Sequence, residues 1–63
     1  MTRYEIIEKM LDKGLSYKRA TEQADAITEK ARYLTRVFGR EIKPEDVIEE
    51  LENKGFNFNT MEV

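Results

Sequence analysis

Cysteine and histidine are absent from this sequence of 63 residues, which leaves it without disulfides, thiolate nucleophiles or the better zinc ligands. An enzyme made from the chain would have to work with carboxylates, tyrosine or lysine alone. The grouped carboxylates, Glu45 with Asp46 and Glu49 with Glu50 and Glu52, are spaced to spread around a helix instead of converging on a pocket. We therefore expect no catalytic residues, no bound metal and no cofactor, and so no enzymatic activity.

Long apolar segments are also missing. No stretch approaches the roughly 20 apolar residues that span a bilayer, and charged residues make up 38% of the chain. Residues 1–10 lack the apolar run of a signal peptide, and the absence of cysteine gives no reason to place the chain in an oxidising compartment. The sequence predicts a soluble, cytoplasmic protein that makes no contact with membranes.

The chain is short enough to form one domain at most. A folded chain of 63 residues buries only about 60% of the surface that its extended form exposes. Small domains usually gain stability from disulfides, metals or oligomers, and the residues needed for the first two are missing here. Self-association is the remaining source of stability, so a homodimer is expected.

The few glycine and proline residues lie where helices should end or begin. Thr2 and Glu5 are spaced as a capping box, and apolar residues at helical spacing follow them, which predicts a first helix over about 3–13. Gly14 occupies the position of a left-handed C-terminal cap, and Ser16 is suited to N-cap a second helix. The start of the chain is therefore expected to form two helices joined by a tight turn.

The second helix should run over about 17–38 and end at Gly39. Pro44 suits the first turn of a third helix, and Gly55 should end that helix. The sequence thus predicts an all-α fold with helices in the order short, long, short, which together form a three-helix domain over residues 1–55.

Residues 56–63 follow this predicted domain as a tail that contains two phenylalanines. Phe56 is expected to fold back onto the core, with Phe58 as the second candidate, because two exposed rings would lower solubility and a small core needs their area. The alternative is a mobile tail that docks on a partner.

The long predicted helix carries a heptad pattern. The triplets Ala20-Thr21-Glu22, Ile27-Thr28-Glu29 and Leu34-Thr35-Arg36 are each one heptad apart. With Tyr17 as position a, the other residues at a are Ala24, Ala31 and Phe38, and those at d are Ala20, Ile27 and Leu34. Small residues in such a seam let two helix backbones approach closely, which favours a tight, antiparallel helix pair, formed either within the chain or between two copies. The predicted seam for self-association or partner binding consists of Ala20, Ala24, Ile27, Ala31, Leu34 and Phe38.

A second face of the same helix combines basic and apolar residues. Lys30, Tyr33 and Val37 gather opposite the seam at 100° per residue, and arginines adjoin them. Arginines interleaved with a tyrosine can hold phosphates or stack on bases. Alternatively, Tyr33 and Val37 receive another helix of the chain, and the arginines meet its acids. The candidate basic patch consists of Lys30, Arg32, Tyr33, Arg36 and Arg40.

Charge is distributed unevenly along the chain. Residues 15–40 carry six basic and three acidic side chains, whereas residues 41–63 carry two basic and seven acidic ones. The two segments either pack beside each other and offset their charges or expose a patch that steers a partner. The pI near 5.1 differs from the strongly basic composition that is usual in dedicated nucleic-acid binders.

Two local resemblances to known families are present. The order of the helices resembles the histone fold, and the segment Gly39-Arg40-Glu41-Ile42-Lys43-Pro44-Glu45-Asp46-Val47 resembles the loop and third-helix entry of archaeal histones. This likeness extends to Leu51 and implies an intertwined dimer through the central helix, although the central helix and the loop are shorter than in that family and the net charge is acidic. The segment from Lys13 to Ala20 is similar to the first turn of ubiquitin-associated domains, whose later helices differ from this pattern.

Two functional hypotheses follow from these patterns. The leading one is a small, non-catalytic, self-associating helical module, an adaptor or inhibitor that binds a larger protein through a helical face. The alternative is a small DNA-binding regulator that uses the basic face of the long helix. Salt separates the two, because DNA binding weakens steeply as salt rises and an apolar helix contact does not.

Overall fold

The computed structural model describes residues 1–60, which form three helices: α1 (Arg3–Asp12), α2 (Tyr17–Phe38) and α3 (Pro44–Asn53). Among these residues there is no strand element. The predicted all-α class and the order short, long, short are confirmed. No helix in this part of the chain has the length and apolar character that crossing a membrane requires.

The helices begin where the sequence places their caps. At the start of α1, the backbone N of Thr2 donates to Glu5 Oε1 at 2.8 Å, and Thr2 Oγ1 accepts from the backbone N of Glu5 at 3.3 Å. The hydrogen bond from the Thr2 backbone lowers the pKa of Glu5 below its ordinary value. At the start of α2, Ser16 Oγ accepts from the backbone N of Arg19 at 3.2 Å. Hydrogen bonds between residues three positions apart therefore fix where α1 and α2 begin.

The two short helices end with the same turn. Each is followed by a glycine with positive φ, 93° at Gly14 and 76° at Gly55, a conformation that residues with a Cβ rarely adopt. The backbone N that follows each glycine donates to the carbonyl five residues before it, from Leu15 to Met10 at 3.3 Å and from Phe56 to Leu51 at 3.0 Å. The segments 6–15 and 47–56 thus form one structural motif twice, and each turns an apolar residue back towards its own helix.

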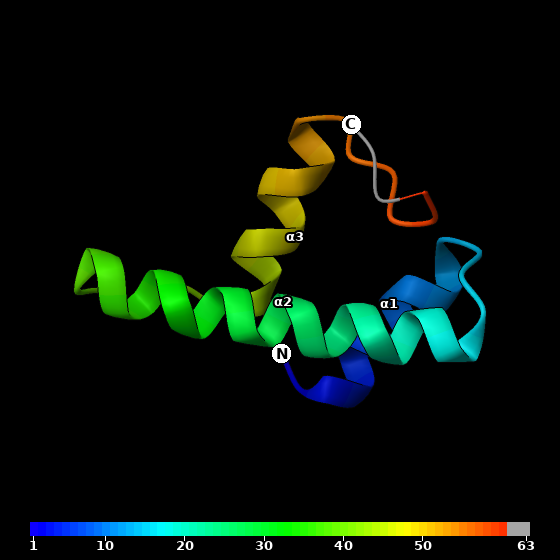
Figure 1. Ribbon diagram of the computed structural model, residues 1–63, viewed down its shortest axis with the longest axis horizontal. Helices are drawn as coiled ribbons and strands as arrows, with labels where there is room; N and C mark the ends of the chain where they lie inside the picture. Colours follow the sequence, from blue (N-terminus) through cyan, green and yellow to red (C-terminus); the bar gives the residue numbers. More distant parts are fainter. Residues whose placement is uncertain (61–63) are drawn as a thin grey trace.

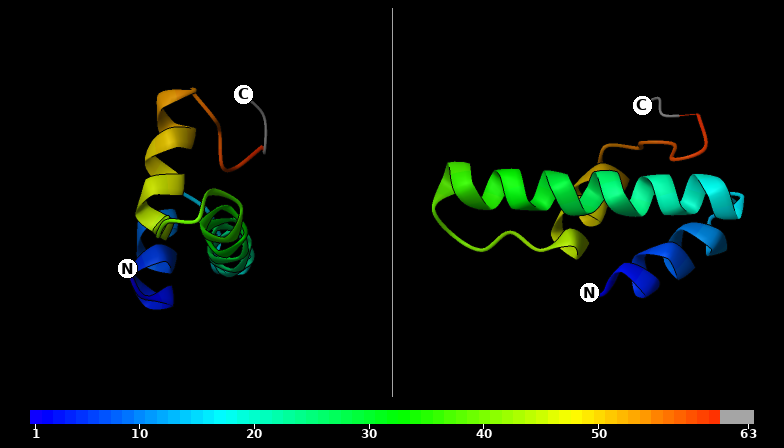
Figure 2. Two further views of the ribbon diagram at one scale, coloured as in Figure 1. Left: turned by 90° about the vertical axis from the view of Figure 1, so that its left-hand side faces the viewer. Right: turned by 60° about the horizontal axis from the view of Figure 1, so that its bottom comes forward.

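The three helices form two layers. The long helix α2 lies along the longest dimension of the molecule, 34 Å, and makes up one layer by itself. The other layer contains α1, which lies along the N-terminal half of α2, and α3, which crosses α2 steeply near its middle (Figures 1 and 2). Because both short helices lie on one side of α2, the opposite side of α2 faces solvent.

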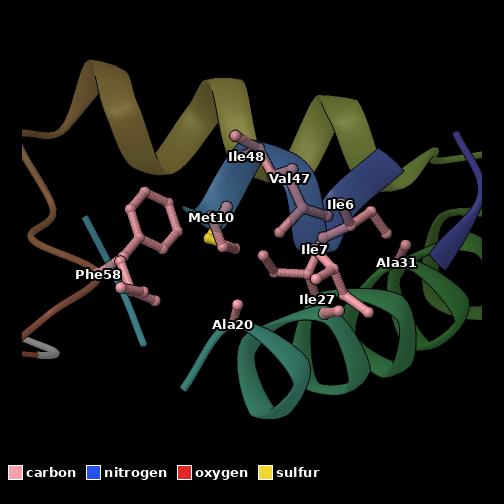
Figure 3. Packing of buried hydrophobic residues seen from close by; sticks show 11 residues of the cluster. Ile6, Ile7, Met10, Ala20, Ile27, Ala31, Val47, Ile48 and Phe58 are labelled. Atoms are coloured by element: carbon pink, nitrogen blue, oxygen red, sulfur yellow. The ribbon is translucent and has the colours of Figure 1, made fainter. Parts of the chain in front are cut away.

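The core lies between the two layers (Figure 3). Small residues of α2, among them Ala20, Ala24 and Ala31, lie under the larger side chains of α1 and α3, which lets the backbones approach closely. Ile6, Met10 and Ile48 are the largest side chains that are fully buried. The complete core cluster consists of Ile6, Ile7, Met10, Leu15, Ala20, Ala24, Ile27, Ala31, Val47, Ile48 and Phe58.

The segment after α3 folds back over this core. Phe58 is only 4% exposed, and its ring meets that of Phe56 edge to face at a centroid distance of 5.0 Å. Lys13 Nζ lies 5.1 Å from the centre of the Phe58 ring and 2.5 Å from Glu52 Oε2. The hydrogen bond from Lys13 lowers the pKa of Glu52. The tail therefore joins the C-terminal end of α1 to that of α3, and its residues 61–63 lie outside the described part of the chain.

Replacing Phe58 with alanine should remove a large part of the stability. The buried ring is worth about 3–5 kcal/mol, against roughly 3–9 kcal/mol for a whole domain of this size. Phe38→Ala is the matched control, because the Phe38 side chain is 61% exposed and alanine favours helix. Urea denaturation in dilute solution measures both variants. Equal losses of less than about 1 kcal/mol would show that the tail does not contribute to the core.

Candidate partner-binding surface on the second helix

The C-terminal end of α2 projects beyond the other two helices. The turns that precede Phe38 extend past α3 and have no helix beside them (Figures 1 and 2). Three large side chains in these turns are more than half exposed: Tyr33 at 55%, Val37 at 57% and Phe38 at 61%. We refer to these three residues as the α2 end. Tyr4 and Tyr17 are also exposed, but Val37 and Phe38 carry no polar side-chain atom that water could bind.

A groove between α2 and α3 continues from this surface. Its volume is about 520 Å³, and its apolar lining comes from both helices and the loop between them: Leu34, Phe38, Ile42, Val47 and Leu51. Charged residues form its rim, with Lys30 and Arg40 on the side of α2 and Asp46, Glu50 and Lys54 on the side of α3. An apolar floor with a polar rim is the arrangement that receives an amphipathic helix in many protein complexes.

Thr35 holds the loop that closes one end of this groove. Its Oγ1 accepts a hydrogen bond from the backbone N of Ile42 at 2.9 Å and donates towards the carbonyl oxygens of Ala31, at 2.8 Å, and Ile42, at 3.1 Å. One hydroxyl therefore satisfies the amide of Ile42 and ties the loop to α2. This tie positions Ile42 in the groove lining.

The structure divides the predicted seam into two parts. Ala20 and Ala24 are fully buried, and Ile27 and Ala31 are each 3% exposed, all of them within the core of a single chain. Leu34 is partly buried against that core, and Phe38 is exposed. Within the described structure α1 and α3 occupy the first four seam positions, so only the last two lie at the groove, open to another molecule.

The five residues of the candidate basic patch are all exposed, but they do not form one patch. Lys30 and Arg40 line the groove, whereas Tyr33 and Arg36 adjoin Val37 in a shallow hollow on the outer side of α2. Arg32 lies on the opposite side of the helix from Lys30 and pairs with Glu29 at 3.2 Å. The basic residues therefore surround the end of α2 instead of presenting one face.

Sequence reasoning missed the wall of the groove that α3 contributes. Leu51 shares the apolar side of α3 with the buried Val47, but Leu51 is partly open and lines the groove next to Glu50. The sequence signal for this wall of the groove was the alternation of apolar and acidic residues in α3. That pattern shows which side of a helix packs and does not show how far the neighbouring helix covers it.

Comparison with known proteins adds no assignment, since no family model, curated protein or solved structure matches the chain. The resemblances to histones and to ubiquitin-associated domains therefore stay predictions. The function of the candidate surface has to be inferred from its own geometry.

Replacing Thr35 with valine should loosen the loop that borders the groove. Valine has nearly the same shape but cannot bind the partly buried amide of Ile42, and an unsatisfied buried donor costs about 1–3 kcal/mol. The matched control is Thr28→Val on the same helix, because the Thr28 hydroxyl binds only the Ala24 carbonyl, at 2.8 Å, in the described structure. Amide hydrogen exchange should be faster at Ile42 in the first variant only. Unchanged exchange at Ile42 would mean that the hydroxyl does not hold the loop.

Proposed function

We propose that this chain is a small, non-catalytic helical interaction module, an adaptor or inhibitor that binds a larger protein and also associates with itself. The observation that supports this best is the α2 end, where Tyr33, Val37 and Phe38 are each more than half exposed and Phe38 also lines an apolar groove. Exposed apolar side chains grouped at one end of a helix are typical of a site for another protein. The proposal places the module in the cytoplasm, because it needs no disulfide.

The energetics favour a protein as the ligand of this surface. Complete burial of a large apolar side chain stabilises a complex by about 1.5–3 kcal/mol, so covering the exposed parts of these three residues contributes roughly 3–5 kcal/mol. Part of that gain offsets the lost freedom of the two molecules. A partner helix with apolar residues at i, i+3 and i+4 would fill the groove and satisfy its own backbone hydrogen bonds.

A second candidate function is DNA binding, and it is supported by the charge of the same region. From Lys30 to Arg40 the chain contains four basic residues and no acidic one, and Tyr33 lies beside Arg36. Against it stand Asp46 and Glu50, which face the same groove and would repel phosphates. Protein binding is therefore the better-supported proposal.

The α2 end should be required for capture of a protein partner. With the tag-free chain immobilised as bait in an extract of its source cells, Phe38→Ala should reduce recovery of the specific partner about tenfold, because the ring that would be buried is gone. Tyr4→Ala is the control, since Tyr4 is 77% exposed but lies on α1. Equal recovery with wild type, Phe38→Ala and Tyr4→Ala would contradict this use of the α2 end.

Salt decides between the two candidate functions. Capture of a protein through apolar contacts should change little when salt is raised from about 0.1 M to about 0.5 M. Binding to a DNA duplex, followed by fluorescence anisotropy, would instead weaken by about one power of salt for each phosphate contacted. We expect salt-resistant protein capture and no tight DNA complex, and the reverse pattern would favour the DNA-binding regulator.

A further inference from the structure

We infer that a second copy of this chain occupies the α2–α3 groove, and that the two copies lie about a twofold axis with the α2 end of each in the groove of the other. This inference rests on the proposed function and names the partner for self-association. It assigns a surface outside most of the predicted seam, because Ala20, Ala24, Ile27 and Ala31 are already buried within one chain.

The charges around the groove are arranged for such a pairing. The basic residues Lys30 and Arg40 lie on the α2 side of the groove, and the α3 side is acidic on balance, with Asp46 and Glu50 beside Lys54. Lys54 Nζ lies 3.5 Å from Glu50 Oε1 in the same chain, so Glu50 is shared between this pair and the partner's basic side. A twofold axis that runs along the groove exchanges its two walls, so the basic side of each copy lies opposite the acidic side of the other, and the contact is made twice. A surface that carries both signs side by side is thus complementary to itself, whereas a uniformly acidic or basic partner would be repelled by one of its sides.

The apolar residues complement one another in the same arrangement. Val37 and Phe38 lie in the last turn of α2, beyond the helices that cover the rest of it (Figure 1), and both are more than half exposed. Phe38 also lines the groove, together with Leu34, Ile42 and Leu51. In an isologous contact every copy supplies both the projecting residues and the groove. The pairing therefore buries exposed apolar surface of both copies. It leaves no binding surface unoccupied, whereas an open chain of copies would leave one at each end.

The surface is small for a protein–protein interface. The α2 end and the groove lining together supply about half of the 20–30 residues per partner found in an interface of standard size. Such a contact gives a weak dimer, with a dissociation constant on the order of 10 µM to 100 µM. The chain should therefore exchange between monomer and dimer, and a partner helix that fills the groove would displace the second copy.

Exchange of the charges at Lys30 and Glu50 tests the arrangement. Both residues are exposed and lie within helices, and lysine and glutamate are both good helix formers, so the fold should be retained. Lys30→Glu places two acids opposite each other at both contacts of the dimer, and Glu50→Lys places two bases there. Each variant should dimerise about five- to tenfold more weakly than the wild type at low salt.

Mixing the two variants should restore association. In the mixed dimer, the acid introduced at position 30 of one copy faces the base introduced at position 50 of the other, and the second contact keeps the native pair of Lys30 and Glu50. Recovery of affinity therefore reports only on the contact between the two substituted residues. The double variant Lys30→Glu/Glu50→Lys should likewise recover wild-type affinity. Lys18→Glu and Glu49→Lys make the same charge changes at exposed positions away from the groove and should leave the dimer unchanged.

Sedimentation equilibrium from about 1 µM to about 1 mM measures all of these proteins. For the wild type, the average mass should rise towards twice the 7.5 kDa of one chain. A wild type that stays monomeric throughout would overturn the inference, and so would a dimer that the single charge changes do not weaken or that mixing does not restore. If the wild type is monomeric and still captures a protein partner through Phe38, this inference is wrong and the proposed binding of a larger protein stands.

Discussion

The mismatch in length between α2 and the helices that cover it governs this structure. At 1.5 Å per residue, the 22 residues of α2 extend for about 33 Å, and α1 and α3 have ten residues each. End to end, the two short helices would nearly cover the long one. Because α3 crosses α2 steeply instead of lying along it, its length is directed away from α2, and the last turns of α2 are left without a partner helix in the described chain.

The direction of α3 also determines the groove. A helix that lay parallel to α2 would bury Leu34 and Phe38, whereas a crossing helix leaves an angle on each side of the crossing point. The loop that Thr35 ties down closes the end of that angle, and Ile42 becomes part of its floor. The proposed binding surface is thus a consequence of how the core is packed and needs no separate element.

Features set by neighbouring residues could be predicted from the sequence. The capping box of Thr2 and Glu5, the N-cap at Ser16 and the end of α2 at Gly39 depend on contacts within a few residues, and the expected helix boundaries agree with the structure to within about one residue. The repeated turn motif of residues 6–15 and 47–56 was missed, because the charges between its apolar positions differ.

The division of the seam could not be predicted for another reason. Ala24 and Phe38 both occupy position a of the heptad pattern, yet one is fully buried and the other is 61% exposed. The pattern carries no information on the crossing angle of α3, which depends on how the side chains of α3 fit against the alanines of α2.

The burial of Phe58 has a consequence for how the protein forms in the cell. Its ring lies in one cluster with Met10 and Leu15, which are synthesised before α2 and α3 (Figure 3). The residues between Leu15 and Phe58 take roughly 2–9 s to add at ordinary rates of translation. For those seconds the apolar side of α1 is covered incompletely, so the emerging chain is a substrate for chaperones and proteases. Because Phe58 is part of the core, the domain completes its folding only after Phe58 has left the ribosome.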